Sequence, residues 1–135
     1  GNSGEEVETE QNYDVVYKRA MTAYKAQYYV EAERLFRHAV SLKEAFSPPD
    51  DPQLAIAYNN LASTLDKRGA PREAEGLYLR AIQICEMRKE TEKINHIQKK
   101  LDELRSTMIT FPGLSPEVCL SSPSCSAPLG SSILL

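Results

Sequence analysis

The sequence predicts an all-α fold built from repeated pairs of helices, and two observations support this prediction. Between residues 13 and 108 the apolar side chains recur every three or four positions, and no run alternates with the period of two that strands require. In the same zone YVEAERLFRHAVSL (29–42) can be laid over PREAEGLYLRAIQI (71–84) at an offset of 42 residues. A period of this length is typical of stacked helix pairs rather than of an ordinary bundle.

The first helix pair is expected at about residues 13–45. Its first helix covers residues 13–26 and gathers five apolar residues on one face: Tyr13, Val16, Ala20, Ala23 and Tyr24. Its second helix covers residues 30–45 and does the same with Ala32, Leu35, Phe36, Ala39, Val40 and Leu42. The segment SPPDDP then ends the pair, because Pro48 and Pro49 cannot continue a helix.

The second pair is expected at about residues 53–87. Asp51 can supply the N-cap oxygen of its first helix, and Pro52 suits the first helical turn. That helix stops at Gly69, whose permissive backbone allows a tight turn, and Pro71 starts the next helix. The two apolar faces contain Ala55, Tyr58, Leu61, Ala62 and Leu65, and then Ala74, Leu77, Tyr78, Ala81, Ile82 and Cys85.

A last helix is expected at about residues 91–108, with an apolar seam of Ile94, Ile97, Leu101, Leu104 and Met108. Because no proline interrupts residues 72–110, a single long helix over about 72–108 is an open alternative. INHIQKKLDE (94–103) aligns with YNNLASTLDK (58–67), but Gln98 replaces the small Ala62 where a paired helix would pack. This difference predicts a capping helix with a polar outer face, which helical solenoids need for solubility.

The ends of the chain differ in composition from this helical zone. Residues 1–12 hold four glutamates and no basic residue, and residues 109–135 are rich in serine and proline, so we expect both to be disordered. The net charge is −3, and the basic residues of the helices are interleaved with acids, which argues against a nucleic-acid partner. No apolar run is long enough to span a membrane. Three cysteines without CxxC spacing favour a reducing, cytoplasmic compartment over a disulfide framework or a zinc site.

The second pair resembles the tetratricopeptide repeat family. Its matching positions are NNLA (59–62), Gly69, Glu73, Ala74, Tyr78 and Ala81. The resemblance covers about residues 13–104, and DDPQLAIAYNNLA is most similar to the longer-period repeats of kinesin light chains and related adaptors. It implies a short αα-superhelix of two helix pairs plus a C-terminal capping helix. The first pair departs from the family pattern at Gln27, which replaces the turn glycine.

In that family the first helix of each pair lines a concave groove that holds peptides. Carried over position by position, the resemblance nominates Tyr17, Met21, Tyr24, Lys25, Asn59, Asn60, Ser63, Asp66, Lys67, Asn95 and Lys99 as groove residues. We expect Asn60 to be exposed in the free protein and to meet a peptide backbone, since its amide both donates and accepts. Some members grip a terminal carboxylate with a Lys/Asn/Asn/Lys/Arg clamp. Only Asn60 matches that clamp, so we expect no chaperone-tail binding.

These observations predict a non-enzymatic protein–protein interaction module, an adaptor or scaffold that binds a peptide or a partner helix. No nucleophile elbow, P-loop or dinucleotide fingerprint occurs in the sequence, so we expect no catalysis, cofactor or metal. One alternative is an enzyme subunit, which would need convergent acids and bases that the sequence does not offer. The other is a structural piece that self-associates weakly through its exposed helix ends.

Overall fold

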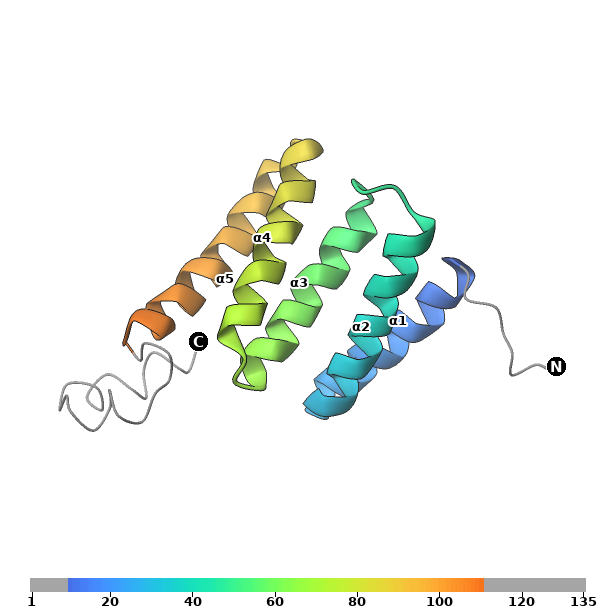
Figure 1. Ribbon diagram of the computed structural model, residues 1–135, viewed down its shortest axis with the longest axis horizontal. Coiled ribbons are helices and arrows are strands. Elements are labelled where there is room, and N and C mark those ends of the chain that lie inside the picture. Colours follow the sequence, from blue (N-terminus) through green and yellow to red (C-terminus); the bar gives the residue numbers. More distant parts are fainter. Residues whose placement is uncertain (1–9, 111–135) are drawn as a thin grey trace.

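A computed structural model describes residues 10–110 of the 135-residue chain as five α-helices. They are α1 (Glu10–Lys25), α2 (Tyr29–Phe46), α3 (Pro52–Lys67), α4 (Pro71–Met87) and α5 (Thr91–Thr110). Figure 1 shows them following one another across the molecule, from α1 on the right to α5 on the left. Each helix packs against the next one in the sequence, and no strand occurs within the described residues. The prediction of an all-α helical repeat is confirmed.

The helix ends differ slightly from the expected ones. Residues 10–12 belong to α1, although the sequence assigned them to a disordered segment. α5 continues to Thr110, two residues beyond the expected end, and the next residue precedes Pro112, where the helical backbone is disfavoured. The rest of the ends predicted to be disordered, residues 1–9 and 111–135, lies outside the described residues.

Three short turns each contain one residue with a left-handed backbone: Gln27 (φ 67°), Gly69 (φ 82°) and Lys89 (φ 58°). In each turn the following residue donates its N–H to a carbonyl five positions back, as Tyr28 does to Ala23 at 2.9 Å. This bond is typical of a helix C-terminus that ends in a left-handed residue. The turn at Lys89 separates α4 from α5, which excludes a single helix over residues 72–108.

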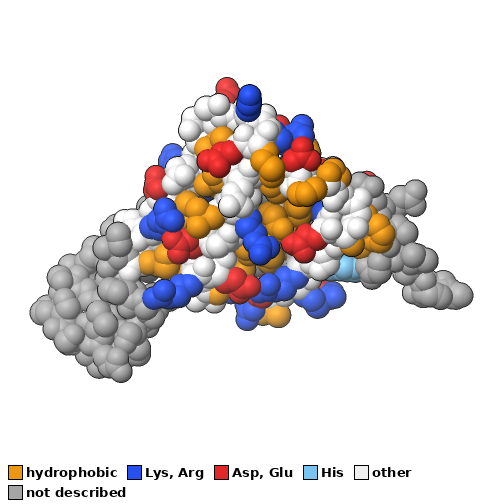
Figure 2. Space-filling view, turned by 45° about the horizontal axis from the view of Figure 1, so that its top comes forward, with side chains coloured by type: hydrophobic (Ala, Val, Ile, Leu, Met, Phe, Trp, Pro, Cys, Tyr) orange, Lys and Arg blue, Asp and Glu red, His pale blue; other side chains and the backbone are white. Residues whose placement is uncertain are grey.

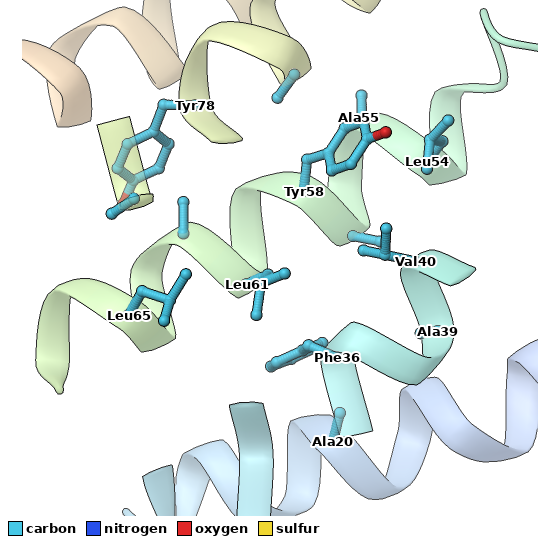
Figure 3. Close-up of a cluster of buried hydrophobic side chains, with 14 of the residues drawn as sticks. Ala20, Phe36, Ala39, Val40, Leu54, Ala55, Tyr58, Leu61, Leu65 and Tyr78 are labelled. Atoms are coloured by element: carbon cyan, nitrogen blue, oxygen red, sulfur yellow. The ribbon is translucent and has the colours of Figure 1, made fainter. Parts of the chain in front are cut away.

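The core forms where small and aromatic residues of successive helices interlock. Ala32 and Ala74 are completely buried, as their assignment to close helix contacts requires, and Phe36 is also completely buried. Figure 3 shows Phe36 of α2 between Ala20 of α1 and Leu61 of α3. The small residues let the helix axes approach, and the ring fills the space beside them. Cys85, expected to belong to the core, is also buried.

Two similar ion pairs join successive helix pairs of the repeat. Glu33 of α2 accepts a hydrogen bond at 2.5 Å from Arg68, at the end of α3, and Glu75 of α4 accepts one at 2.7 Å from Arg105 of α5. In both cases the second helix of one pair contacts the helix that follows the pair. α5 therefore occupies the position of the first helix of a third pair. Its Gln98 side chain is half-buried and donates to Asp102 of the same helix at 3.0 Å.

A buried lysine, which the sequence pattern did not indicate, fixes the linker between α2 and α3. Lys43 is 2% exposed, and its ammonium donates to Gln53 Oε1 at 2.6 Å and to Asp51 Oδ2 at 3.2 Å. The same ammonium lies 4.5 Å from the centre of the Tyr13 ring of α1, within cation–π range. These contacts connect α1, α2 and the start of α3, and thereby help to set the angle at which the second pair meets the first.

Candidate peptide-binding groove

Hydrogen bonds between α1 and α3 join residues that the sequence assigned to the groove. The Asn60 amide of α3 donates to Tyr17 Oη of α1 at 2.8 Å and lies 3.7 Å from Met21 Sδ. All three residues are half-buried. The Tyr17 ring stacks on Tyr13, with ring centroids 5.5 Å apart, and meets Phe36 edge-on at 6.0 Å. The core therefore holds the phenol that faces Asn60.

Asn60 is less exposed than the sequence predicted. Its Nδ2 donates to Tyr17, and its Oδ1 accepts a hydrogen bond from Asn59 Nδ2 at 3.3 Å, so the amide bridges two helices in the free protein. The expectation that Asn60 is exposed was wrong. The repeat pattern predicts on which face of its helix a residue lies, but it does not predict which side chains of a neighbouring helix contact that residue. An amide has two donors and two acceptor lone pairs, so Asn60 retains the capacity to meet a peptide group as well.

Lys100 of α5 continues this row on the other side of α3. Its ammonium donates to Asn59 Oδ1 at 3.5 Å, and the residue is half-buried. Burial lowers the pKa of Lys100, while the nearby Glu103 carboxylate acts in the opposite direction. Tyr17, Asn60, Asn59 and Lys100 thus form a row of polar side chains across α1, α3 and α5, which we call the polar row.

The sequence assigned Asn95 and Lys99 of α5 to the groove and missed Lys100. The structure leaves Asn95 and Lys99 exposed, and in the described part of the chain no hydrogen bond or ion pair joins them to the polar row. Lys100 follows the buried Ile97 by three positions, and therefore flanks the apolar seam on the same face of the helix. The three-residue spacing from Ile97 could have identified Lys100, whereas the position-by-position alignment selected its neighbour, Lys99.

Three further groove candidates, Ser63, Asp66 and Tyr24, lie toward the C-terminal ends of α1 and α3. The Ser63 and Tyr78 hydroxyls are hydrogen-bonded at 3.0 Å, and burial is the main cause that raises the pKa of Tyr78 to about 12. The Tyr24 ring meets Tyr29 edge-on at 5.4 Å. Burial raises the pKa of Tyr24, and the charge of Asp66 adds to this effect. The predicted groove residues Tyr24, Ser63 and Asp66 therefore lie near one another.

The two remaining groove candidates are lysines at helix ends. Lys25 ends α1 and Lys67 ends α3, and both are exposed. Burial raises the pKa of the Asp66 carboxyl, an effect that Lys67 opposes and the Glu103 carboxylate reinforces. This end of α1 and α3 therefore combines the carboxylates of Asp66 and Glu103 with two long lysine side chains.

The groove offers hydrogen-bonding groups of several kinds. Amides, hydroxyls and an ammonium can satisfy the donors and acceptors of an extended polypeptide. Among residues 10–110 no group of three or more His, Cys, Asp or Glu side chains is placed to hold a metal ion. No helix in that range has the length and apolar character needed to cross a membrane. Figure 2 shows acidic and basic side chains next to one another on the face in view.

Comparison with known proteins agrees with this architecture. The family model described as tetratricopeptide repeat matches residues 14–87, which is more than half of the chain and covers most of α1 and all of α2, α3 and α4. No curated protein matches the sequence. Repeats of this family generally mediate protein–protein interactions and are generally not catalytic. The match and the paired helices show that the chain belongs to the tetratricopeptide repeat family.

Proposed function

We propose that the protein is a non-enzymatic adaptor that holds an extended peptide or a partner helix across α1, α3 and α5. The observation that carries this proposal is the polar row, which places half-buried amide, phenol and ammonium groups on one face of three successive first helices. Its residues are held in place by neighbours, so little side-chain freedom is lost when a ligand binds.

The chemistry of the row suits a peptide backbone. Asn59 and Asn60 can each donate to a carbonyl and accept from an N–H, and Lys100 favours a carboxylate. Met21 and Tyr24 add apolar area beside them, and Ser63 adds a hydroxyl. The kinesin light chain-like character of the linker is part of this proposal, as is a cytoplasmic location, which suits the free thiol of Cys85.

The test is to select ligands for the full chain from a library of random dodecapeptides displayed on phage. Selected peptides are then titrated against the protein and against Asn60→Ala. We expect Asn60→Ala to weaken binding by about 1–3 kcal/mol, because a ligand group is left buried and unpaired, which corresponds to roughly five- to 150-fold in Kd. Losing the bond to Tyr17 should also lower the free energy of unfolding by about 1 kcal/mol without unfolding the protein.

Tyr17→Phe is the comparison that separates the two roles of Asn60. It removes the same interhelical hydrogen bond but leaves the amide in place, so it should cost similar stability and less binding. Equal losses of binding in Tyr17→Phe and Asn60→Ala would mean that Asn60 acts only as a bridge between helices. Failure to select any peptide would contradict the adaptor proposal itself.

A second candidate, self-association, is favoured by one specific observation. Leu79 of α4 occupies the repeat position of Arg37 in α2, where Arg37 forms an ion pair at 2.9 Å with Glu73 of the next unit. Leu79 is 40% exposed, and Met87 of the same helix is 57% exposed. A second copy could cover these apolar side chains. Sedimentation equilibrium of the protein and of Leu79→Glu tests this candidate, which predicts a dimer only for the unchanged chain.

A further inference from the structure

A pocket opens between α3 and α5, with α4 at its floor. It is open to solvent and has a volume of about 350 Å³, near the lower end of the size range of ligand pockets, which is about 300–1,000 Å³. Its apolar lining consists of Ala55, Ile56, Cys85 and Ile97. The other four lining residues, Asn59, Glu92, Lys93 and His96, are polar. The pocket is therefore an apolar cavity with polar groups around it.

The residue types at this position explain why the space is not filled. Ala55 contributes only a methyl group, and Cys85 is completely buried beneath it. On the facing side α5 presents His96, which is exposed and does not fill the apolar space. Ile56 is consequently 38% exposed although it lines the cavity.

The pocket is continuous with the polar row through one residue. Asn59 lines the cavity and also accepts the hydrogen bond from Lys100. Lys100 is four residues after His96, one helical turn or about 6 Å along α5. A ligand that fills the pocket therefore comes within reach of the Lys100 ammonium.

The charges beside the pocket differ in how well they are paired. Lys93 forms an ion pair with Glu90 at 3.4 Å. Lys100 instead has the amide oxygen of Asn59 at 3.5 Å, a long hydrogen bond to a neutral acceptor. Because burial lowers its pKa even with Glu103 nearby, Lys100 is a partly dehydrated cation. An incoming carboxylate would supply a stronger acceptor than the amide oxygen of Asn59.

We infer that the pocket takes an aliphatic side chain of a partner peptide, such as leucine or methionine, and that Lys100 pairs with an acidic residue two positions away from it. The inference rests on the proposed peptide-binding function. Side chains two positions apart on an extended chain point to the same side and are separated by about 6.6 Å. This spacing is close to the helix rise of about 6 Å between His96, which lines the pocket, and Lys100. Burying the aliphatic side chain strengthens binding by roughly ten- to hundredfold.

The experiment sequences the dodecapeptides that the full chain selects from the same phage library. We expect enrichment of Leu or Met with Asp or Glu two positions away. Two variants test the two subsites: Ile56→Glu places a charge at the apolar lining, and Lys100→Gln removes the cation. Ile56→Glu should abolish the aliphatic preference, and Lys100→Gln should abolish the acidic preference while keeping the aliphatic one.

Matched controls exist for both changes. Val15→Glu alters an exposed β-branched residue of α1 that is 52% exposed and does not line the pocket. Lys89→Gln removes a lysine in the α4–α5 turn, at a left-handed position where Gln27 shows that glutamine is accommodated in the equivalent turn. Both controls should select the same peptides as the unchanged protein, and thermal melting verifies that all four variants are folded.

The outcomes distinguish the two proposals. For selected peptides with both features, replacing the aliphatic residue by Ala should raise Kd about tenfold or more. Selection of peptides without the aliphatic–acidic pair, or unchanged selection by Ile56→Glu and Lys100→Gln, would overturn the inference and leave the adaptor function intact. Selection of no peptide would overturn both.

Discussion

At the scale of single residues, the left-handed positions show how similar turns are built from different side chains. Gly69 adopts positive φ without a steric penalty, whereas Gln27 and Lys89 adopt it at a cost. The backbone hydrogen bonds are the same in all three turns. The helices on either side of Gln27 and Lys89 therefore compensate for a local conformation that these residues disfavour.

Substitutions at these positions should change stability in opposite directions. Gly69→Ala is expected to lower the free energy of unfolding by about 1–2 kcal/mol, the cost of a left-handed non-glycine residue. No atom lies within 4 Å of the Cβ that would be added, so this cost is conformational rather than steric. Gln27→Gly should raise the free energy of unfolding by about 1 kcal/mol or less, because glycine also gains entropy in the unfolded chain. Urea denaturation measures both, and a stable Gly69→Ala would show that this turn can relax.

The groove shows what sequence patterns predict about single residues and what they do not. The repeat placed Tyr17, Met21 and Asn60 on helix faces that the structure brings together. It did not predict the bond from Asn60 to Tyr17, because that contact depends on how closely two first helices approach across α2. Lys100 was missed because the alignment pairs it with Thr64 of α3, which is a buried position rather than a groove position.

At the scale of helices, the contact between Lys43 and Asp51 makes the junction of α2 and α3 sensitive to acid. Burial would raise the pKa of Asp51, but hydrogen bonds from the Gln53 N–H, Ser47 and Lys43 outweigh it and leave the pKa below its usual value. A carboxyl group with a lowered pKa stabilises the folded protein above its unfolded pKa, and this stabilisation is lost as pH falls through the folded pKa. The melting temperature should therefore begin to fall below about pH 4, near the usual pKa of aspartate.

Asp51→Asn provides the control for this pH dependence. Asparagine is as good an N-cap as aspartate and can still accept from the Gln53 N–H, which is 2.8 Å from Asp51 Oδ1. The variant should melt at a lower temperature at neutral pH and lose less stability on acidification. Glu33, whose pKa is also lowered because bonds from Arg68 and Arg37 outweigh its burial, should preserve part of the dependence. An acid profile identical to that of the unchanged protein would contradict the role assigned to Asp51.

Close packing between helices is tested by enlarging a buried alanine. Ala74 is 0% exposed, so Ala74→Leu should destabilise the protein by about 1–3 kcal/mol through overpacking. Lys67→Leu is the control, because Lys67 is exposed at the end of α3 and the change should be nearly silent. Chemical denaturation gives both values. Similar losses at the two positions would show that the register of the repeat has been misassigned.

The order of the helices could be predicted from the sequence, but the boundary between α4 and α5 was left open between a break at about residues 87–91 and a single long helix. Prolines and Gly69 mark the end of α2, both ends of α3 and the start of α4 in the sequence. The break between α4 and α5 lacks such a mark, because its left-handed residue is Lys89. It is stabilised instead by the bond from the Glu90 N–H to the Cys85 carbonyl and by the packing of α5 back on α4. The buried Lys43 was missed because its acceptors come from the loop and the next helix.

At the scale of the whole molecule, stability is distributed along a row of neighbouring helices. Each helix packs mainly against the next one, and the ion pairs Glu33–Arg68 and Glu75–Arg105 repeat the junction between units. In such an array the terminal element contributes through a single interface, so its loss exposes the neighbouring repeat. α5 has a partner only in the helices before it within the described residues, yet its Ile97, Leu101 and Leu104 are buried.

Two truncations test this division of the chain. Removing residues 111–135 should leave the helical signal and the free energy of unfolding nearly unchanged, because the buried core extends only from Tyr13 to Leu104 in the described part of the chain. Removing residues 91–135 also deletes α5 and the burial of Ile97, Leu101 and Leu104, each worth about 1.5–3 kcal/mol. The sum, roughly 5–9 kcal/mol, is comparable to the whole stability of a small domain, about 5–15 kcal/mol. The shorter chain should therefore lose cooperative unfolding, as circular dichroism during urea titration would show. If both truncations cost the same, residues 111–135 must stabilise the core, and the assignment of α5 as the cap of the array would have to be abandoned.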